Sequence, residues 1–430
     1  MVGGFNKKTV RDINLAGKRV LLRADYNVPV RDNRVVDDYR LRQSLPTIEY
    51  ILQQKPAALV IISHLGRPQG KPDPDLSLLP VVKRLSQLLG QPVAFAMDCI
   101  GPQAKAAGKI TLFENLRFHE EEEKNDPVFA KALVEASQPE VFVQDGFGVV
   151  HRVHASTDAI TKLLPSVVGL LLEKEINVIT KVMQAPDRPF MAVIGGAKIS
   201  DKIEVLNKFI KEADAVAVVG ALANNFLRAE SLKIGKSIYE PDVMPHTRDI
   251  LQKARAEEKR RNFNFFIPID AVVSKSMDGR LPTRVVDLTS HTLADIEAYP
   301  KKPPPEAYNV STGELILDIG PLSAAQIAGA LKMCRTVVWG GTAGVTETKG
   351  IAGAQDPFTH GTRALAEAMI GASNTHQNKP FSLVGGGDTV AYVKAEGLLE
   401  DFNHVSTGGS ASLELIAGKR LPGIEALLDK

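Results

Sequence analysis

Short, continuous apolar runs rich in β-branched residues recur along the chain, a pattern typical of strands buried in a parallel sheet. Between these runs, apolar residues return every three or four positions, which predicts amphipathic helices. The predicted strands lie at, or begin at, residues 19–29, 58–63, 110–118, 141, 190–194, 215–219, 265–267, 336–339, 381–384 and 403–406. The predicted helices lie at residues 40–54, 200–212, 245–258, 323–333, 362–372 and 391–398. This alternation predicts an α/β fold.

One long segment interrupts the alternation. Residues 163–183 are apolar-rich with helical spacing and end near two prolines, after which strands and helices resume. Because 430 residues exceed what a single hydrophobic core usually serves, we expect two α/β halves with this segment as the boundary. A looser stretch at 275–305, which contains three consecutive prolines, is expected to form surface loops.

Composition narrows the classes of function. Apolar residues make up 44% of the chain, and 52 basic against 50 acidic side chains leave a formal charge of +2, which gives no indication of a nucleic-acid partner. Cys99 and Cys334 lie far apart without metal-ligand spacing, which favours buried, reduced thiols and a cytoplasmic location. The first residues lack an apolar signal core, and no run approaches the roughly 18 apolar residues that span a bilayer, so we expect no membrane role.

Polar residues occupy the first predicted strand in an unusual way. Arg23, Asp25 and Asn27 are spaced by two, so a strand would project all three to one side, where a core strand would carry apolar residues. This pattern indicates a cleft. A buried salt bridge between Arg23 and Asp25 is a compatible alternative. Arg40 stands at the start of the helix that follows.

Further cations follow the later strands of the first half. His64 and Arg67 come directly after one strand, and Arg117 and Arg152 lie just beyond the ends of two others. Any one of them is more often a surface residue than a ligand, but their recurrence at strand ends predicts a site for a small polyanion. The acidic run at 120–123 is interpreted as a solvated loop.

The second half begins with a glycine pair after a strand. Residues 194–203 read Ile-Gly-Gly-Ala-Lys-Ile-Ser-Asp-Lys-Ile, with Lys198 and Lys202 one helical turn apart. Glycines that let the backbone approach an anion, followed by a helix N-terminus, suit a phosphate cradle. A solvated helix start capped by Ser200 or Asp201 explains the segment equally well.

Later glycine clusters also follow strands, at 340–341, 385–387 and 408–409. Three such turns at one sheet edge would form a nucleotide site, although tight turns need glycine for backbone reasons alone. Asp388, after the triple glycine, is a candidate helix cap or ligand for a phosphate-bound Mg²⁺. The P-loop, dinucleotide-binding, protein-kinase and hydrolase-elbow fingerprints are absent.

Eight motifs together resemble phosphoglycerate kinase in the order of that family and cover nearly the whole chain. They lie at residues 23–29, 64–68, 114–118, 151–156, 195–202, 318–321, 385–389 and 406–409. The resemblance implies two domains, each a parallel sheet flanked by helices in a Rossmann-like α/β arrangement, joined by a hinge helix. The implied boundaries are an N-terminal domain at 1–165, a hinge helix at 166–185, a nucleotide-binding domain at 186–408 and a tail at 409–430 that returns to the N-terminal domain.

The resemblance also implies reversible phosphoryl transfer between 1,3-bisphosphoglycerate with ADP and 3-phosphoglycerate with MgATP, by a monomer whose domains close on the ligands. The implied 3-phosphoglycerate ligands are Asp25, Asn27, Arg40, His64, Arg67, Arg117 and Arg152. The implied nucleotide ligands are Lys198, Lys202, Gly220, Ala221, Leu222, Glu347, Gly385, Gly386, Gly387, Asp388 and Thr389, with Asp388 also serving the metal. Arg40, Lys202 and Gly387 are the catalytic candidates, because a carboxylate nucleophile needs stabilised charge rather than a general base.

Departures from the family pattern concentrate on the nucleotide side. Residues 339–342 read Trp-Gly-Gly-Thr where the family usually has Trp-Asn-Gly-Pro, a short insertion follows Glu347, and Ala221 replaces a usual glycine. Gln144, Gly146 and Ser410 are further replacements. Two alternatives follow: a catalytically impaired relative that acts as a binding or scaffold protein, and a kinase for another acyl phosphate.

Overall fold

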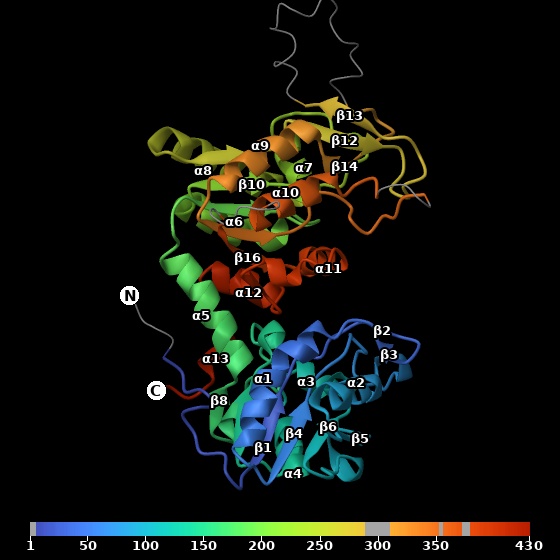
Figure 1. Cartoon of the computed structure of the whole chain (residues 1–430), viewed down its shortest axis with the longest axis vertical. Helices are drawn as coiled ribbons and strands as arrows, with labels where there is room; N and C mark the ends of the chain where they lie inside the picture. Colours follow the sequence, from blue (N-terminus) through green and yellow to red (C-terminus); the bar gives the residue numbers. More distant parts are fainter. Residues whose placement is uncertain (1–5, 289–309, 352–355, 372–378) are drawn as a thin grey trace, which may run out of the picture. The chain divides into compact units, whose positions relative to one another are not determined.

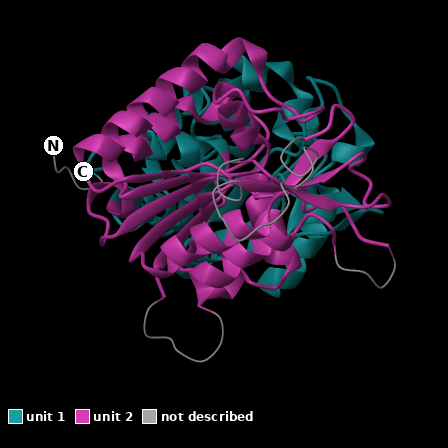
Figure 2. Ribbon diagram, turned by 90° about the horizontal axis from the view of Figure 1, so that it is seen from above, with its two compact units in different colours: residues 1–180, 410–430 teal, residues 181–409 magenta. Residues whose placement is uncertain are grey.

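The computed structural model describes residues 6–288, 310–351, 356–371 and 379–430, which form two compact units. Unit 1 comprises Met1–Thr180 together with Ser410–Lys430, and unit 2 comprises Lys181–Gly409 (Figure 2). Each unit holds a six-stranded parallel sheet with helices packed against it, so the predicted fold class is confirmed (Figure 1). The division between the units falls inside helix α5 (Leu170–Gln184).

The sheet of unit 1 has the strand order β5-β6-β4-β1-β7-β8. Its strands are β1 (Arg19–Arg23), β4 (Ala58–Ile62), β5 (Ala94–Ala96), β6 (Ile110–Phe113), β7 (Val141–Gln144) and β8 (Ser166–Val168). A separate hairpin consists of β2 (Val30–Arg31) and β3 (Arg34–Val35). Besides α5, the helices of unit 1 are α1 (Tyr39–Gln53), α2 (Leu79–Leu89), α3 (Glu120–Glu123), α4 (Pro127–Ser137), α12 (Ser410–Ile416) and α13 (Pro422–Glu425).

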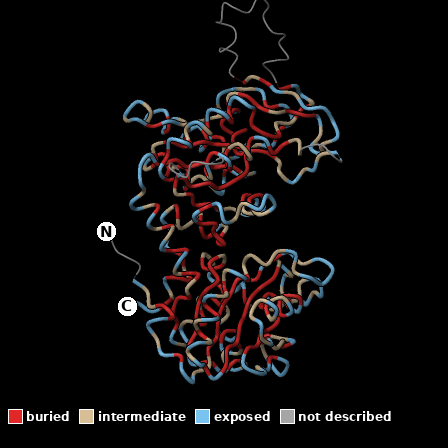
Figure 3. The backbone as a smooth tube through the Cα atoms, viewed as in Figure 1, coloured by how far each residue is buried: buried red, intermediate tan, exposed pale blue. Residues whose placement is uncertain are grey.

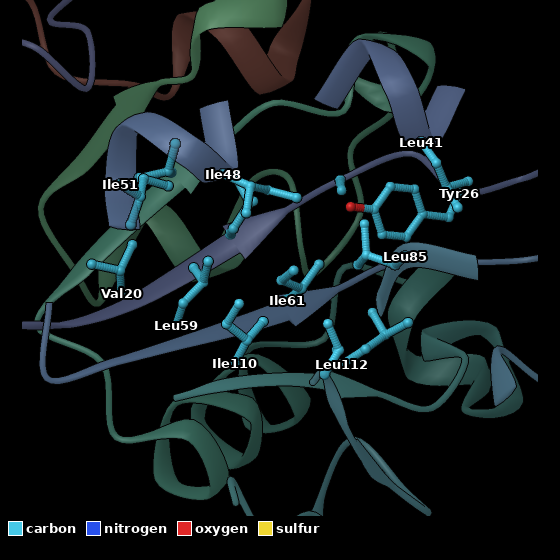
Figure 4. Close-up of a cluster of buried hydrophobic side chains, with 14 of the residues drawn as sticks. Val20, Tyr26, Leu41, Ile48, Ile51, Leu59, Ile61, Leu85, Ile110 and Leu112 are labelled. Atoms are coloured by element: carbon cyan, nitrogen blue, oxygen red, sulfur yellow. The ribbon is translucent and has the colours of Figure 1, made fainter. Parts of the chain in front are cut away.

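Strand β1 shows why this sheet is buried on both faces. Val20 and Leu22 belong to one hydrophobic cluster and Leu21 to another, because successive strand side chains point to opposite faces. The first cluster includes Ile48 and Ile51 of α1 (Figure 4). Figure 3 shows that buried residues, in red, are concentrated in the interior of each unit. At about 25 cal/mol per Å² of apolar area removed from water, such two-sided burial is the main stabilising term.

Two boundaries in unit 1 differ from the sequence prediction. The first strand ends at Arg23 rather than continuing to residue 29, because the Asp25 carboxylate accepts a hydrogen bond from the Asn27 backbone N–H (3.1 Å) and turns the chain. Asp25 and Asn27 therefore do not project from a strand. The predicted hinge helix at 166–185 begins only at Leu170, since residues 166–168, which include the β-branched Val167 and Val168, pair with β7 as strand β8.

The C-terminal segment joins unit 1 through its backbone. Leu428 accepts a hydrogen bond from the Lys8 N–H (2.8 Å) and donates its own N–H to Ser166 (3.0 Å), while Gly423 donates to Val150 (2.8 Å). The Val150 contact ties this segment to the turn that carries the histidines and arginine of 151–154, which form part of the site described below.

Unit 2 contains the sheet β11-β10-β9-β15-β16-β17 and a three-stranded antiparallel sheet, β13-β12-β14. The strands are β9 (Phe190–Ile194), β10 (Ala215–Val218), β11 (Asn264–Phe266), β12 (Asp270–Ser274), β13 (Arg284–Asp287), β14 (Leu315–Ile319), β15 (Thr336–Gly340), β16 (Phe381–Gly385) and β17 (His404–Val405). The helices are α6 (Ile203–Glu212), α7 (Gly220–Ala229), α8 (Met244–Arg260), α9 (Pro321–Lys332), α10 (His360–Ile370) and α11 (Gly387–Ala395).

The antiparallel sheet corrects the interpretation of 275–305 as surface loops. Strand β13 lies inside this stretch and pairs with β12, whereas residues 289–309 fall outside the described part of the chain. The sequence signal was weak because β13 spans only four residues, of which Arg284 and Asp287 are charged.

Both cysteines are buried and free, as predicted. Spatially, Cys99 lies near Asp98 and His119, whose potential ligand atoms are all within 4.8 Å of one another and of its sulfur. Asp98 Oδ1 and His119 Nε2 are only 2.7 Å apart, and burial raises the pKa of the Cys99 thiol well above its ordinary value. This group is therefore a hydrogen-bonded carboxylate and imidazole beside a protonated thiol. Among the described residues, no helix is long and apolar enough to cross a membrane.

Candidate active site

The cations of unit 1 gather where its parallel strands end. Arg23 closes β1 and is level with Ile62 at the end of β4 and Gln144 at the end of β7, so the segments that follow these strands emerge at one edge. We call the resulting group the cation cluster. It consists of four arginines and three histidines that lie among their charges: Arg23, Arg40, Arg117, Arg152, His64, His151 and His154.

Asp25 holds Arg40 in place. The two side chains form an ion pair with 2.6 Å between Arg40 Nη1 and Asp25 Oδ2. The Asp25 side chain is 6% exposed and that of Arg40 is 27% exposed, so the guanidinium keeps a face toward solvent. A charge-assisted bond in such a partly desolvated position fixes the guanidinium with some of its five N–H donors left for a ligand.

His64 is buried beside Arg23, with 3.3 Å between His64 Nδ1 and Arg23 Nη2. Burial, followed by the charges of Arg23 and Arg117, lowers the pKa of His64 well below its ordinary value, so the ring is neutral at pH 7. Because a guanidinium can only donate, Nδ1 is the acceptor and the proton resides on Nε2. His64 therefore offers a neutral N–H donor.

The backbone at Gly66 is held from two sides. Its N–H donates to Asn27 Oδ1 (2.9 Å), and its carbonyl accepts from Arg117 Nη1 (2.8 Å). Arg117 Nε also lies 3.3 Å from the carboxylate of Glu123. These contacts bring Asn27 and Arg117 to the loop that carries Arg67, which is itself exposed.

His151 and His154 flank Arg152, and sequence reasoning did not assign either to the site. Burial, together with neighbouring arginine charges, lowers the pKa of His151 to about 4 and that of His154 to about 3. Both rings are therefore neutral at pH 7 and do not add to the positive charge. Their position within the motif at 151–156 was the signal that could have identified them.

The acidic run at 120–123 is not a solvated loop, as had been expected, but the short helix α3, and Glu122 within it is fully buried. Its carboxylate lies 3.9 Å from Arg23 and accepts hydrogen bonds from the Ser156 hydroxyl (2.6 Å) and N–H (3.0 Å). The alternative salt bridge between Arg23 and Asp25 is likewise replaced, since Arg23 pairs with Glu122 and Asp25 with Arg40.

Unit 2 has a pocket of about 190 Å³ at the ends of its strands. It is lined by glycines and alanines together with larger apolar side chains from several segments. The sequence-predicted residues among its lining are Gly220, Ala221, Glu347 and Asp388. The lining residues that sequence reasoning did not assign to the nucleotide include Asn224, Leu227, Met277 and Asp318. Leu222 is not part of the lining, because it is buried in the core and its N–H donates to Gly196 (2.7 Å).

Glycines at this pocket allow backbones to touch. A Cβ at Gly341 (φ +118°) would lie 2.1 Å from the carbonyl carbon of Gly195, and a Cβ at Gly220 would lie 2.6 Å from the Thr342 oxygen. The Gly341 N–H donates to the Thr389 hydroxyl (2.7 Å), which is buried. The Thr389 hydroxyl therefore supports the glycine turn from inside.

Lys198 and Lys202 occupy different environments rather than one helical face. Lys198 is exposed and precedes the 3₁₀ turn at Ser200–Lys202, which leads into α6. Lys202 is partly buried, and this burial lowers the pKa of its amine against the opposing effect of nearby Asp201 and Asp388. Glu240, which sequence reasoning missed, fixes the turn by accepting from the Ser200 hydroxyl (2.7 Å).

The glycine cluster at 385–387 closes strand β16 and opens helix α11. Gly386 has φ +89°, which favours glycine, and Gly387 and Asp388 are exposed in the first turn of the helix. Their backbone N–H groups and the positive end of the helix dipole face the same region as the Asp388 carboxylate, an arrangement suited to a phosphate with its metal ion.

Comparison with known proteins decides the family. The model of the phosphoglycerate kinase family matches residues 10–419. Phosphoglycerate kinases from Pelotomaculum thermopropionicum and Moorella thermoacetica are each 42% identical to this chain, covering 99% of it and 100% of their own lengths. The chain belongs to the phosphoglycerate kinase family. The structures of phosphoglycerate kinases from Coxiella burnetii (32% identity, TM-score 0.77) and Pyrococcus horikoshii (27% identity, TM-score 0.80) each match over 98% of both chains.

As a phosphoglycerate kinase, the chain catalyses phosphoryl transfer between 1,3-bisphosphoglycerate with ADP and 3-phosphoglycerate with ATP. The resemblance seen in the motifs is thus confirmed over the whole chain. Neither alternative, an impaired scaffold protein or a kinase for another acyl phosphate, receives support from these comparisons.

Proposed function

We propose that the cation cluster of unit 1 binds 3-phosphoglycerate and that the glycine-lined pocket of unit 2 binds the nucleotide. The observation that carries this assignment is the concentration of arginines at one sheet edge of unit 1, with Arg40 fixed by Asp25 and Arg117 fixed against Gly66. A ligand with a phosphate and a carboxylate matches these donors. Asn27, His64, Arg67 and Arg152 complete the proposed set.

In the nucleotide site, Lys198, Lys202 and the turn at 385–387 are proposed to hold phosphates, while Gly220, Ala221 and Glu347 line the pocket for the base and ribose. Exposed Asp388 supplies the hard oxygen ligand that Mg²⁺ prefers. When bound, Mg²⁺ would neutralise charge on the nucleotide phosphates. Thr389 contributes through its bond to Gly341, and Leu222 through its buried contact with the loop at Gly196.

The chemistry requires charge stabilisation and no general base, because the carboxylate of 3-phosphoglycerate is ionised at pH 7. Arg40, Lys202 and the Gly387 N–H are proposed to stabilise the oxygens of the phosphoryl group during transfer. In-line transfer needs reacting atoms roughly 3 to 3.5 Å apart, so the two ligand-bearing units must close on one another, with α5 as the proposed hinge. We further propose that the enzyme acts as a cytoplasmic monomer.

Paired variants test the assignment. Arg152→Ala should weaken 3-phosphoglycerate binding by about 10- to 100-fold and leave ATP binding within twofold, because the loss of a charge-assisted bond costs about 1.5 to 3 kcal/mol. Lys202→Ala should show the reverse preference. Calorimetric titration of both ligands into both variants is the measurement. Equal losses for the two ligands in either variant would contradict the separation of the sites.

A further inference from the structure

Glu122 is a buried acid beside the cation cluster that the proposed ligand set does not include. It belongs to the four-residue helix α3, yet its side chain is completely buried while Glu120 and Glu123 are exposed. Burying a carboxylate costs several kcal/mol unless partners compensate. The contacts of the Glu122 carboxylate therefore indicate which groups compensate for its burial.

Its partners are the turn after the histidines and the end of strand β1. Oε1 accepts from the Ser156 hydroxyl (2.6 Å), Oε2 accepts from the Ser156 N–H (3.0 Å), and the Glu122 carbonyl accepts from the Ala155 N–H (2.9 Å). The Ser156 hydroxyl also accepts from Arg23 Nε (2.8 Å). One carboxylate thus fixes a serine that is itself bonded to the innermost arginine.

The same carboxylate is the nearest counter-charge of Arg23, at 3.9 Å from Nη2. Arg23 is fully buried and contacts His64 Nδ1 through that same nitrogen. The other charged or titratable groups that interact electrostatically with Arg23 or Glu122 include Arg117, Asp25, Cys99 and His154, whose Nδ1 is 3.8 Å from Glu122. Without Glu122, the repulsion between the buried guanidinium and Arg117 would be left without its nearest counter-charge, and the guanidinium would lose its fixed orientation.

We propose that Glu122 is a positioning residue for 3-phosphoglycerate binding, acting through Ser156 and Arg23 to set the turn that carries Arg152 and the tautomer of His64. The chain of contacts reaches the proposed ligands without Glu122 touching the substrate: Glu122 to Ser156 to the 151–156 turn, and Glu122 to Arg23 to His64. This inference rests on the proposed assignment of the cation cluster to 3-phosphoglycerate.

The variant Glu122→Gln tests the proposal, because it keeps the shape of the side chain and removes the charge. We expect KM for 3-phosphoglycerate to rise about tenfold or more while KM for ATP stays within twofold. Glu120→Gln is the matched control in the same helix, since Glu120 is exposed and pairs with Lys124, and it should change neither constant. A purely structural role would lower the melting temperature and leave both KM values unchanged.

Ser156→Ala provides a second route should Glu122→Gln fold poorly. It removes the hydroxyl shared by Glu122 and Arg23 but keeps both charges, so KM for 3-phosphoglycerate should rise less, by about three- to tenfold. If KM for 3-phosphoglycerate is unchanged in a folded Glu122→Gln or Ser156→Ala enzyme whereas Arg152→Ala weakens this ligand, the positioning role is wrong and the site assignment stands. If Arg152→Ala has no effect either, the site assignment itself is wrong.

Discussion

The two proposed sites of this enzyme differ in the groups that form them. In unit 1 the site consists of charged side chains that are fixed by one another, as in the pair of Asp25 and Arg40. In unit 2 the proposed site combines a few charged side chains with closely packed backbone, where Gly195, Gly220 and Gly341 leave no room for side chains. The proposed site for the small anion in unit 1 depends on how charged side chains are arranged, whereas the proposed nucleotide pocket in unit 2 depends on the shape of the backbone. Substitutions in the two units should therefore fail in different ways.

The largest effect is expected where backbone shape matters most. In Gly341→Ala, the new Cβ would meet Gly195 at 2.1 Å, and φ at this position is +118°. Strain and overpacking each cost about 1 to 3 kcal/mol, so unit 2 should lose most of its stability. Scanning calorimetry of thermal unfolding measures the change in melting temperature.

The control is Gly329→Ala in helix α9, where a Cβ would meet nothing within 4 Å. This variant should be as stable as the native protein or slightly more stable, because alanine favours helix. A Gly341→Ala protein with an unchanged melting temperature would show that the glycine contact does not constrain the pocket.

The contrast also explains how much of each site could be predicted from sequence. His64 and Arg117 were found because polar residues at strand ends stand out from an apolar pattern, and Arg40 because it stands at the start of helix α1. Glu122 was missed because an acidic run has the same composition whether exposed or buried, and burial comes from Arg23 and Ser156, distant in sequence. In unit 2, the glycines themselves could be read from the sequence. The close contact between Gly195 and Gly341 could not, because it joins segments that are distant in sequence.

The elements of the fold could likewise be predicted only where they leave a local pattern in the sequence. Most of the parallel strands were predicted from continuous apolar runs, such as 58–62 and 190–194, because burial on both faces leaves a strong local pattern, whereas the three-residue strands β5 and β8 were missed. The antiparallel strands β12 and β14 were not predicted. Each has only five residues, and Asp270 and Asp318 interrupt their apolar pattern while accepting hydrogen bonds from the N–H groups of Ser323 and Gly361, which are distant in sequence.

The next effect concerns one buried acid in each unit. Burial raises the pKa of Asp145 and of Asp318 to about 7 from the ordinary 3.8. The folded state then binds more protons than the unfolded state between pH 4 and 7, so the free energy of unfolding contributed by each acid falls as pH rises through this window. At about 1.4 kcal/mol per pKa unit, the loss is at most about 4 kcal/mol for each.

Urea unfolding at several pH values measures this slope. Asp145→Asn and Asp318→Asn should each reduce the fall in stability between pH 4 and 7, whereas exposed Asp242→Asn serves as the control and should leave it unchanged. Asparagine keeps one acceptor oxygen for the N–H groups of Leu171 and Gly361, which these two acids respectively bond. An unaltered slope in both variants would contradict the inferred proton uptake.

A smaller effect, of about 1.5 to 3 kcal/mol, is expected for the charge that meets the transferred group. Arg40→Ala should lower kcat by about 10- to 100-fold and leave nucleotide affinity unchanged. Arg42→Ala is the matched control on the same helix, because Arg42 is half exposed and pairs with Asp38. Steady-state kinetics with a coupled dehydrogenase would reveal the difference, and an unchanged kcat in Arg40→Ala would remove Arg40 from the catalytic role.

The smallest effect concerns the departure from the family pattern at Gly340, which closes β15 and accepts a hydrogen bond from the Gly195 N–H (2.9 Å). Restoring the usual asparagine adds one neutral contact, worth about 0.5 to 1.5 kcal/mol, to a site whose charged groups are already present. Gly340→Asn should therefore change KM for ATP by less than about tenfold and leave kcat nearly unchanged, the pattern of a contact made equally in ground and transition states. Gly340→Ala is the control, because it adds a side chain at this buried position without the amide group of asparagine. If Gly340→Asn altered kcat by more than tenfold while Gly340→Ala did not, the amide would take part in the transition state, and the nucleotide site would depend on side-chain chemistry as strongly as the cation cluster does.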